Sequence, residues 1–518
     1  MIYRFDHAHE GDLQAIAGRV GGKGASLWAM TTRMGLPTPP GFTIGCDYCP
    51  RYEREGLAPD LLRDIDAELA RLGERLGRRF GDPQRPLLLA VRSGARVSMP
   101  GMMETVLNVG VTPDTLDGLA AMTGSRCFAL DAYQRFLSMF AGCVLDIKPA
   151  DVHAAPTDLE ALERSATALE LQVTAAIGAA ALRDPHYLLR ETIGAVFRSR
   201  HSAPARAYRA REGLPDDLGT AVTVQSMVFG NLDADSGTGV MFTRDPSTGE
   251  NRPCGDWMAR AQGEDVVAGI RATRPIDELA TAMPAVWEDL CRHAATLEHY
   301  YRDMVDIEFT VERGELWILQ ARVGKRSAAA AARIAVELAE EGSYGVDRGE
   351  AVARVPASLL KGDTALDEHP EPPLTRGLPA SPGAASGRVV LCPDAAIDAA
   401  EAGDDVILVR RETSPADVHG MSAAAGVLTT LGGLMSHAAV VARDWGLPAV
   451  VGAEAIRIDG HGFHVGGQFV AAGETVSIDG ASGAVYRGAL PSHRRGSEYV
   501  ETLRSWAREE SAAAGSGA

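Results

Sequence analysis

The sequence predicts an α/β protein built from several domains. At 518 residues the chain is longer than one ordinary domain, so about two to four domains are expected. Strand-like apolar runs and segments with helical periodicity occur in both halves of the chain. A polar, proline-bearing stretch at 367–377 separates them and is expected to be semi-rigid. We therefore predict a domain over 1–342, a linker over 343–377, and a second domain over 378–487.

Composition limits the classes of partner. There are 51 Lys and Arg against 69 Asp and Glu, a net charge of −18, which argues against a general nucleic-acid or anionic-membrane binder but not against ATP. No basic apolar leader and no run of ~18 apolar residues is present, so the cytoplasm is the expected compartment and no membrane segment is expected. Seven scattered cysteines predict no disulfide framework, and the single pair Cys46 and Cys49 is interpreted as chance spacing.

The first candidate motif is the glycine-rich stretch 21–24, which precedes a helical pattern. It is not a Walker A loop, because Ala17 stands where the first glycine belongs and Gly24 replaces the hydroxyl residue after the lysine. Spacing alone is compatible with a phosphate-binding turn that presents Lys23. It is equally compatible with a plain glycine turn and a solvated lysine.

A second motif follows the apolar run 87–91, which predicts a buried strand. The loop after it contains Gly94 and Gly101, and small residues allow backbone N–H groups to approach a phosphate. Arg92 and Arg96 could pair phosphate oxygens with their planar guanidinium groups. A flexible basic loop accounts for the same residues.

The middle of the chain carries weaker signals. Residues 112–212 have a helical pattern without clustered chemistry, and 221–231 alternates as a strand does. A second glycine-bearing loop spans 236–250 and contains Thr243 in an apolar context. The segment 261–269 closes this group of motifs.

Residues 306–322 predict a β-hairpin with a definite register. A three-residue loop at 312–314, with glycine in the left-handed position, would pair Phe309 with Trp317. This register puts the polar side chains on one face. Those side chains are Asp306, Glu308, Gln320 and Arg322.

Oxygen donors on one face suit Mg²⁺, so we expect Glu308 and Gln320 to act as metal ligands beside a nucleotide. The alternative is an ordinary amphipathic hairpin with a solvated polar face. A two-residue loop would put Gln320 on the face opposite Glu308.

The chemically most informative histidine is His437. A β-branched run at 426–430 precedes it, and Ser436 stands at the N-cap position of a helix predicted to end near Trp445, with Gly446 as stop signal. Free N–H groups and the helix dipole at that end favour an anion. A neutral imidazole there could accept a phosphoryl group, although most histidines are surface or capping residues.

Taken together, these motifs resemble the pyruvate phosphate dikinase family of phosphoenolpyruvate-utilising enzymes. The resemblance extends over nearly the whole chain up to its C-terminal tail. It implies an ATP-grasp-like nucleotide-binding domain over 1–342, with a helical portion at 112–212, followed by a swivelling β/β/α phosphohistidine domain over 378–487. Residues 488–518 are expected to form a short helix and a flexible tail. The glycine loop resembles the dikinase form, which uses inorganic phosphate, more than the synthase form, which uses water.

The resemblance also implies an activity and a site. ATP and inorganic phosphate would phosphorylate His437, giving AMP and pyrophosphate, with Mg²⁺ as cofactor. The implied phosphate-holding residues are Lys23, Arg92 and Arg322, the implied Mg²⁺ ligands are Glu308 and Gln320, and the further implied nucleotide contacts are Gly101, Thr243 and Asp306.

Two features depart from the family. A threonine that is a regulatory phosphorylation site in several members is replaced by Met435, and Leu447 stands where dikinases often carry lysine. The family's pyruvate-binding barrel needs ~250 residues, and only a short tail follows residue 487. The expected acceptor is therefore a separate barrel subunit or a small molecule, as in phenylphosphate synthase or rifampin phosphotransferase. A non-catalytic, nucleotide-binding regulator of a full-length dikinase is the alternative, and an oligomer is compatible with the sequence.

Overall fold

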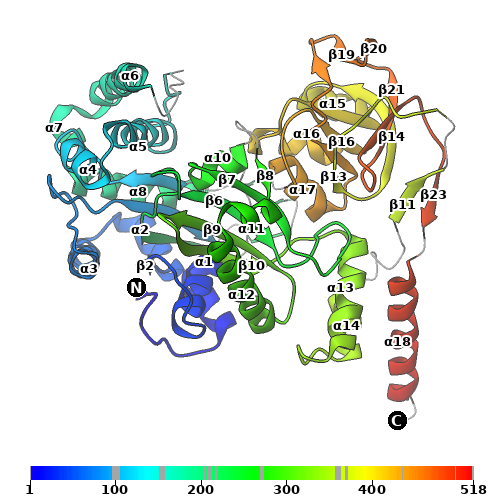
Figure 1. The fold of residues 1–518 in the computed structure, drawn as a ribbon, viewed down its shortest axis with the longest axis horizontal. Coiled ribbons are helices and arrows are strands. Elements are labelled where there is room, and N and C mark those ends of the chain that lie inside the picture. Colours follow the sequence, from blue (N-terminus) through cyan, green and yellow to red (C-terminus); the bar gives the residue numbers. More distant parts are fainter. Residues whose placement is uncertain are drawn as a thin grey trace. The chain divides into compact units, whose positions relative to one another are not determined.

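In the computed structural model the chain forms two compact units (Figure 1). Unit 1 comprises Met1–Ser236 and Thr310–Gln320, and unit 2 comprises Gly237–Phe309 and Ala321–Ala518. The residues that the structure describes are 2–95, 105–150, 158–202, 205–206, 209–210, 213–215, 219–268, 273–355, 363–367, 371–434, 436–495 and 497–515. Apart from Thr310–Gln320, the division groups residues 237–342 of the predicted nucleotide domain with everything that follows them.

Unit 1 contains a five-stranded sheet in the order β1-β2-β5-β3-β4, with every pairing antiparallel. Its strands are β1 (Ile2–Arg4), β2 (Gly41–Ile44), β3 (Leu89–Ala95), β4 (Thr105–Val109) and β5 (Thr220–Ser226). β2 and β5 are buried along their whole length. The predicted strand 87–91 therefore begins two residues later than expected and extends to Ala95.

The helices of unit 1 supply most of its core. They are α1 (Leu13–Thr32), α2 (Cys49–Glu55), α3 (Pro59–Leu76), α4 (Leu116–Thr123), α5 (Arg126–Met139), α6 (Leu159–Ile177), α7 (Ala179–Leu182) and α8 (Pro185–Ser199). In α3, Leu61, Ile65 and Leu69 recur every four residues and are all buried, which is the spacing of one helix face. Helices α4 to α8 occupy the stretch predicted to be helical.

The glycine-rich stretch 21–24 lies inside α1, where the helix is kinked. Gly21 has φ +73° and ψ 168°, so the helix axis breaks there and a new helical segment begins just before Lys23. The predicted turn followed by a helix is thus present, but a helix also precedes it.

Unit 2 begins with a sheet in the order β10-β9-β6-β7-β8. Its strands are β6 (Gly237–Phe242), β7 (Cys254–Ala259), β8 (Arg274–Pro275), β9 (Val305–Glu312) and β10 (Glu315–Val323). Helices α10 (Gly263–Ala268), α11 (Leu279–Ala282) and α12 (Pro284–Tyr301) belong to the same part of the chain. The boundary between the units runs through β9 and β10.

The predicted three-residue loop of this hairpin is wrong. β9 ends at Glu312 and β10 begins at Glu315, so the turn consists of Arg313 and Gly314 alone. Both have positive φ, 53° and 79°, which is the type I′ geometry that matches the twist of paired strands. The local sequence fits either loop length, and the structure has the shorter one.

Strict alternation from this turn would put Asp306 and Arg322 on opposite faces. Instead the Arg322 Nε donates a 2.9 Å hydrogen bond to Asp306 Oδ2. The N–H of Gly324 donates to the carbonyl of Met304, which is one residue out of the register set at the turn. The pairing therefore shifts by one residue along the hairpin, as it does at a β-bulge.

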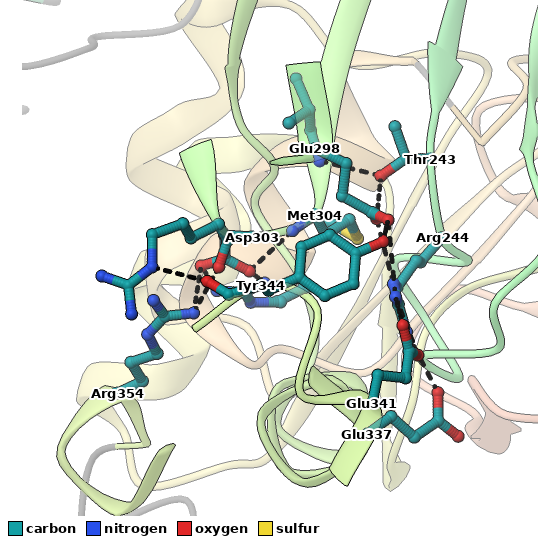
Figure 2. A network of polar contacts seen from close by, with 12 residues as sticks. Thr243, Arg244, Glu298, Asp303, Met304, Glu337, Glu341, Tyr344 and Arg354 are labelled. Carbon is teal, nitrogen blue, oxygen red and sulfur yellow. Dashed lines mark hydrogen bonds and ion pairs between the residues drawn. The ribbon is translucent and has the colours of Figure 1, made fainter. Parts of the chain in front are cut away.

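A buried polar network holds the segment after β6 in place (Figure 2). The Arg244 side chain is fully buried and pairs with Glu298 at 3.0 Å, Glu337 at 3.3 Å and Glu341 at 3.1 Å. The Tyr344 hydroxyl donates a 2.7 Å hydrogen bond to Glu298. One guanidinium group thus joins α12 to α13 (Ala328–Glu341).

The second sheet of unit 2 has eight strands in the order β12-β22-β21-β14-β15-β16-β17-β13, of which β14 to β17 are parallel. The bounds are β12 (Thr375–Arg376), β13 (Leu378–Ser381), β14 (Ala384–Val390), β15 (Val406–Arg410), β16 (Gly426–Thr429), β17 (Ala449–Val451), β21 (Thr475–Asp479) and β22 (Ala484–Arg487). Strand β15 is buried on both faces, as parallel strands usually are.

These two faces of the sheet pack against different layers. On one face Val406 and Leu408 share a core with three helices, namely α15 (Pro393–Glu401), α16 (Val418–Ala423) and α17 (His437–Trp445). On the other, Ile407 and Val409 share a core with Phe463 of a three-stranded sheet. That sheet consists of β18 (Arg457–Ile458), β19 (Gly462–Val465) and β20 (Gln468–Ala471). The order of layers is small sheet, large sheet, helices.

The predicted linker and tail are more structured than expected. Helix α14 (Arg348–Arg354) lies within the predicted linker, and α18 (Glu498–Gly515) replaces the short helix and frayed tail. Leu503 and Trp506 of α18 are buried in one core with α13 and α14. Strand β11 (Asp363–Leu366) pairs antiparallel with β23 (Ser492–Arg495). The segments that enter and leave the eight-stranded sheet therefore lie side by side. Among the described residues, no helix is both long enough and apolar enough to cross a membrane.

Candidate functional site

The predicted helix after Ser436 is confirmed in its bounds. Helix α17 begins at His437, ends at Trp445, and is followed by Gly446 with φ 62°. Ser436 occupies the N-cap position, but its side chain makes no capping hydrogen bond. His437 is thus the first residue of the helix, where backbone N–H groups are not yet used within it.

The two ring nitrogens of His437 lie in different surroundings. Nδ1 is 3.0 Å from the hydroxyl oxygen of Thr413. Nε2 is buried and has no hydrogen-bond partner among the described residues. Burial lowers the pKa of His437 to about 4, and the Asp417 carboxylate opposes this only in part. The ring is therefore neutral at physiological pH, and Nε2 is the nitrogen left for chemistry.

The other end of α17 packs against the first part of unit 2. Arg443 is buried, and it donates to the carbonyls of Ala380 at 3.0 Å and Leu434 at 2.6 Å. Its guanidinium carbon lies 5.8 Å from the centroid of the Phe242 ring. Burial lowers the pKa of Arg443 to about 10, although Asp306 and other nearby acidic groups raise it. Helix α17 therefore sits against strand β6 within unit 2.

Lys325 and Asp444 add an ion pair to the same packing. Lys325 follows β10, and Asp444 is the residue after Arg443. Their side chains retain 23% and 24% exposure, so this pair lies at the edge of the packed surface. It joins the helix that begins with His437 to the end of the predicted nucleotide-binding hairpin.

Asp306 and Arg322 form the charged centre of that hairpin. The Arg322 Nη2 is 2.8 Å from Asp306 Oδ2, and Asp306 is 6% exposed. Asp306 raises the pKa of Arg322, so the guanidinium stays charged. Burial raises the pKa of Asp306, which Arg322 counteracts. The second carboxylate oxygen of Asp306 has no hydrogen-bond partner among the described residues.

Lys23 and Arg92 belong to unit 1, where backbone packing brings their segments together. A Cβ at Gly21 would lie 2.0 Å from the carbonyl oxygen of Gly94, so the kink of α1 touches the end of β3. In the strand register Arg92 lies opposite Thr223, whose hydroxyl is 3.2 Å from that of Thr43. Lys23 and Arg92 are both half-buried.

The remaining predicted residues have varied surroundings. Glu308 is half-buried in β9, while Gln320 is 7% exposed and its side-chain oxygen has no hydrogen-bond partner among the described residues. Gly101 and Met435 lie outside the described residues. No group of three or more His, Cys, Asp or Glu that could hold a metal occurs among the described side chains. The structure thus groups the candidates into Lys23 with Arg92 in unit 1, and Asp306 with Arg322 in unit 2.

Thr243, a predicted nucleotide contact, lies in the buried network around Arg244. Its hydroxyl donates a 2.7 Å hydrogen bond to Glu298 and accepts a 3.1 Å bond from the N–H of Val305 (Figure 2). The side chain is 7% exposed. Both roles of the hydroxyl are used inside the network, so Thr243 supports the fold around Arg244.

Two residues of the site were missed by the sequence analysis, Thr413 and Arg443. A signal for Thr413 was present, because it follows β15, a strand that pairs in parallel with the strand preceding His437. Parallel neighbours end at the same edge of a sheet, which is where ligands of α/β folds usually bind. Arg443 had no such signal, since its partners come from distant parts of the chain.

Comparison with known proteins gives two family matches. Residues 57–285 and 278–343 match the pyruvate phosphate dikinase AMP/ATP-binding domain, and residues 402–483 match the mobile domain of PEP-utilising enzymes. The second match contains His437, Thr413 and Arg443, and the first contains the hairpin.

Relatives include three pyruvate, phosphate dikinases. The protein of Rhizobium meliloti (strain 1021) is 45% identical over 91% of this chain and 56% of its own length. The Giardia intestinalis protein is 43% identical over 94% of this chain and 58% of its own length. Pyruvate, phosphate dikinase 2 of Zea mays is 43% identical over 91% of this chain and 56% of its own length. The chain thus spans a little more than half the length of these relatives. It belongs to the pyruvate phosphate dikinase family.

Proposed function

We propose that the chain catalyses ATP-dependent phosphorylation of its own His437, by chemistry of the dikinase type. The observation that carries this proposal is the state of the His437 ring. It is neutral, one nitrogen is hydrogen-bonded, and the other is buried without a hydrogen-bond partner among the described residues. Its place at the start of α17 adds backbone N–H groups and a helix dipole that stabilise a phosphoryl group.

Three cationic residues would hold the phosphates of ATP in this proposal. Lys23 and Arg92 lie on segments of unit 1 that contact each other through Gly21 and Gly94. Arg322 is held in place by Asp306 in unit 2. In an ATP-grasp-like domain, such planar guanidinium and ammonium donors would neutralise the charge of the nucleotide's phosphates. Phosphoryl transfer depends mainly on such positioning and charge neutralisation.

The residues of the hairpin also fit the Mg²⁺ that accompanies ATP. Mg²⁺ prefers oxygen ligands and usually takes one or two from the protein and the rest from phosphates and water. We propose Glu308 and Gln320 as these ligands, and the buried side-chain oxygen of Gln320 has no hydrogen-bond partner among the described residues. The two-residue turn alone would put the two side chains on opposite faces, so their binding of one ion requires that the register shift lies between them and the turn. When bound, the ion would offset charge that develops on the phosphates.

The proposed products fix which bonds change. The Nε2 lone pair attacks the β-phosphorus of ATP, and the bond from this phosphorus to the oxygen bridging the α-phosphorus breaks. AMP leaves with that electron pair. Inorganic phosphate then takes the γ-phosphoryl group, which gives pyrophosphate and leaves the β-phosphoryl group on His437.

The proposed domain motion is a swivel of the phosphohistidine domain. Its support is the paired entry and exit at β11 and β23, which is compatible with the domain moving on a double strand. Onward transfer would go to a small molecule or to a separate barrel subunit. Loss of label from the phosphorylated protein on addition of a candidate acceptor, with pyruvate first, tests this step.

The central experiment uses ATP labelled at the β-phosphate. Incubation with Mg²⁺ and inorganic phosphate should give an acid-labile, base-stable label that is absent from His437→Asn. The matched control is His419→Asn, which removes an exposed histidine of the neighbouring helix α16 and should leave the label unchanged. Equal labelling of His437→Asn and the unaltered protein would overturn the proposal. Formation of pyrophosphate only when inorganic phosphate is present would separate dikinase from synthase chemistry.

A further inference from the structure

The hydroxyl group beside His437 comes from the loop that follows strand β15. Thr413 lies three residues after the end of β15, and its hydroxyl oxygen is 3.0 Å from Nδ1 of His437. A neutral imidazole carries one proton, so one nitrogen donates and the other accepts. A threonine hydroxyl can take either role. How well its position is fixed depends on the hydrogen bonds of the loop that carries it.

The Thr413 segment is fixed from both sides. The Asp417 carboxylate accepts a 2.7 Å hydrogen bond from the N–H of Ser414 and a 2.8 Å bond from its hydroxyl. Arg410 lies 3.1 Å from the other carboxylate oxygen of Asp417. Asp417 is 5% exposed, so this turn is anchored in the domain interior. The position of Thr413 is therefore set by an anchored turn.

The strand ladder also extends past the ends of the strands toward His437. The N–H of Thr430 donates to the carbonyl of Arg410 at 3.1 Å, and the N–H of Leu431 donates to that of Arg411 at 2.8 Å. These bonds tie the segment that leads into Thr413 to the segment that leads into α17. The two partners of the 3.0 Å contact are thus held by neighbouring parallel strands.

We propose that Thr413 is a positioning residue for His437, whose hydroxyl oxygen accepts the Nδ1–H and thereby holds the tautomer in which Nε2 carries the lone pair. This inference rests on the proposed function, in which Nε2 attacks phosphorus. The opposite tautomer would put a proton on Nε2 and block the attack. When the N–P bond forms, no proton has to leave the ring, because the Nδ1–H stays hydrogen-bonded to Thr413 while the ring takes up positive charge.

The test combines a spectroscopic and a kinetic readout on the full chain. ¹⁵N chemical shifts of histidine-labelled protein, assigned with His437→Asn, report which nitrogen of His437 carries the proton. The unaltered protein and Thr413→Ser should show the proton on Nδ1, whereas Thr413→Val should show a mixture of tautomers. Loss of one hydrogen bond predicts a roughly 3- to 10-fold slower labelling of Thr413→Val with little change in KM for ATP. Thr413→Ser should stay within about twofold.

Thr475→Val, on strand β21 of the same sheet, is the matched control and should match the unaltered protein in both readouts. A proton on Nε2 in the unaltered protein would overturn the inference. So would a Thr413→Val protein that keeps the proton on Nδ1 and labels His437 at the unaltered rate. Absence of label in the unaltered protein would count against the proposed function alone, because the tautomer is measured without ATP. If Thr413→Val fails to fold, the unaltered protein and Thr413→Ser still decide the tautomer.

Discussion

Gly21 and Gly94 are in backbone contact: a Cβ built on Gly21 would lie 2.0 Å from the Gly94 carbonyl oxygen. Gly21 also has φ +73° and ψ 168°, a conformation that only glycine adopts without strain. The contact joins the turn that presents Lys23 to the strand that carries Arg92. The sequence indicated two separate glycine motifs, and the structure makes them one packed arrangement within unit 1.

The first prediction concerns Gly21→Ala. The added methyl group must displace the end of β3, and positive φ adds a cost of about 1–3 kcal/mol for a non-glycine residue. We expect a loss of at least about 2 kcal/mol in the free energy of unfolding, together with weaker ATP binding. Denaturant unfolding and ATP titration measure the two effects.

Gly18→Ala is the matched control for this substitution. Gly18 lies in the same helix, and a Cβ there meets nothing within 4 Å. Replacement by alanine should leave stability unchanged or raise it by up to about 1 kcal/mol. If the two variants behave alike, the contact with Gly94 does not constrain the turn.

The second prediction concerns Asp306→Asn. The substitution removes a negative charge that lies 2.8 Å from the Arg322 guanidinium and also near the buried Arg443. Removing one member of a buried ion pair costs about 3–5 kcal/mol, and the 30% exposure of Arg322 reduces this to about 2–4 kcal/mol. Chemical denaturation measures the loss, and a raised KM for ATP would accompany it if Arg322 holds a phosphate.

Asp117→Asn provides the comparison, because Asp117 pairs with Arg126 at 2.7 Å while 95% exposed. Such exposed pairs contribute about 0–1 kcal/mol. An equal effect of the two substitutions on unfolding would show that Asp306 does not stabilise a buried guanidinium.

Local sequence predicted the helix at His437 because its signals are local. Ser436 and Gly446 delimit nine residues whose apolar positions face one core, and no distant partner is needed to place them. The hairpin shows the limit of such reasoning. Glu312 to Glu315 fit a two- or a three-residue loop, and no local pattern indicates the register shift that brings Arg322 to Asp306.

Tertiary contacts account for what the sequence did not predict. The amphipathic pattern at the C-terminus was predicted, but its packing was not, because the partners of Leu503 and Trp506 lie on α13 and α14, more than 140 positions earlier. The nucleotide contact of Thr243 stays a prediction that the family resemblance implies, whereas its hydrogen bond within the buried network was not predicted. Its partner Glu298 lies 55 residues further on, and no local pattern indicates that pairing.

The third prediction concerns pH. The native pKa of His437 is about 4 and its ordinary value is 6.5, so below pH 6.5 the unfolded chain takes up a proton that the native ring does not. The titration of His437 therefore does not reduce the free energy of unfolding above about pH 6.5, and it reduces it progressively as the pH drops toward 4. Between pH 7.5 and 5 the loss is about 2 kcal/mol.

His437→Gln isolates this contribution, because other groups titrate over the same range in both proteins. We expect the free energy of unfolding of the unaltered protein to fall by about 2 kcal/mol more than that of the variant over this interval. Labelling from ATP should not decline through protonation of the ring between pH 8 and 6. Parallel stability curves for the two proteins would show that the ring titrates normally.

The last prediction concerns Lys325 and Asp444, which form an ion pair between the end of β10 and helix α17. In the proposed function His437 must be held near the nucleotide while it is phosphorylated, and this pair lies on the same helix, at the edge of the packed surface. Its side chains are about a quarter exposed, so the attraction contributes no more than about 1 kcal/mol, and reversing one charge replaces it with a repulsion of similar size.

Lys325→Glu and Asp444→Lys should therefore each slow labelling of His437 about 5- to 10-fold, more strongly at low salt than at high salt. The double variant restores opposite charges in exchanged positions, so it should recover most of the rate, and the coupling between the two substitutions measures the pair. Added salt weakens the repulsion in the single variants and should bring all four proteins closer together. If the two effects instead multiply, so that the double variant is slower than either single one, the two residues act separately, and packing by Arg443 alone would hold α17 during phosphorylation.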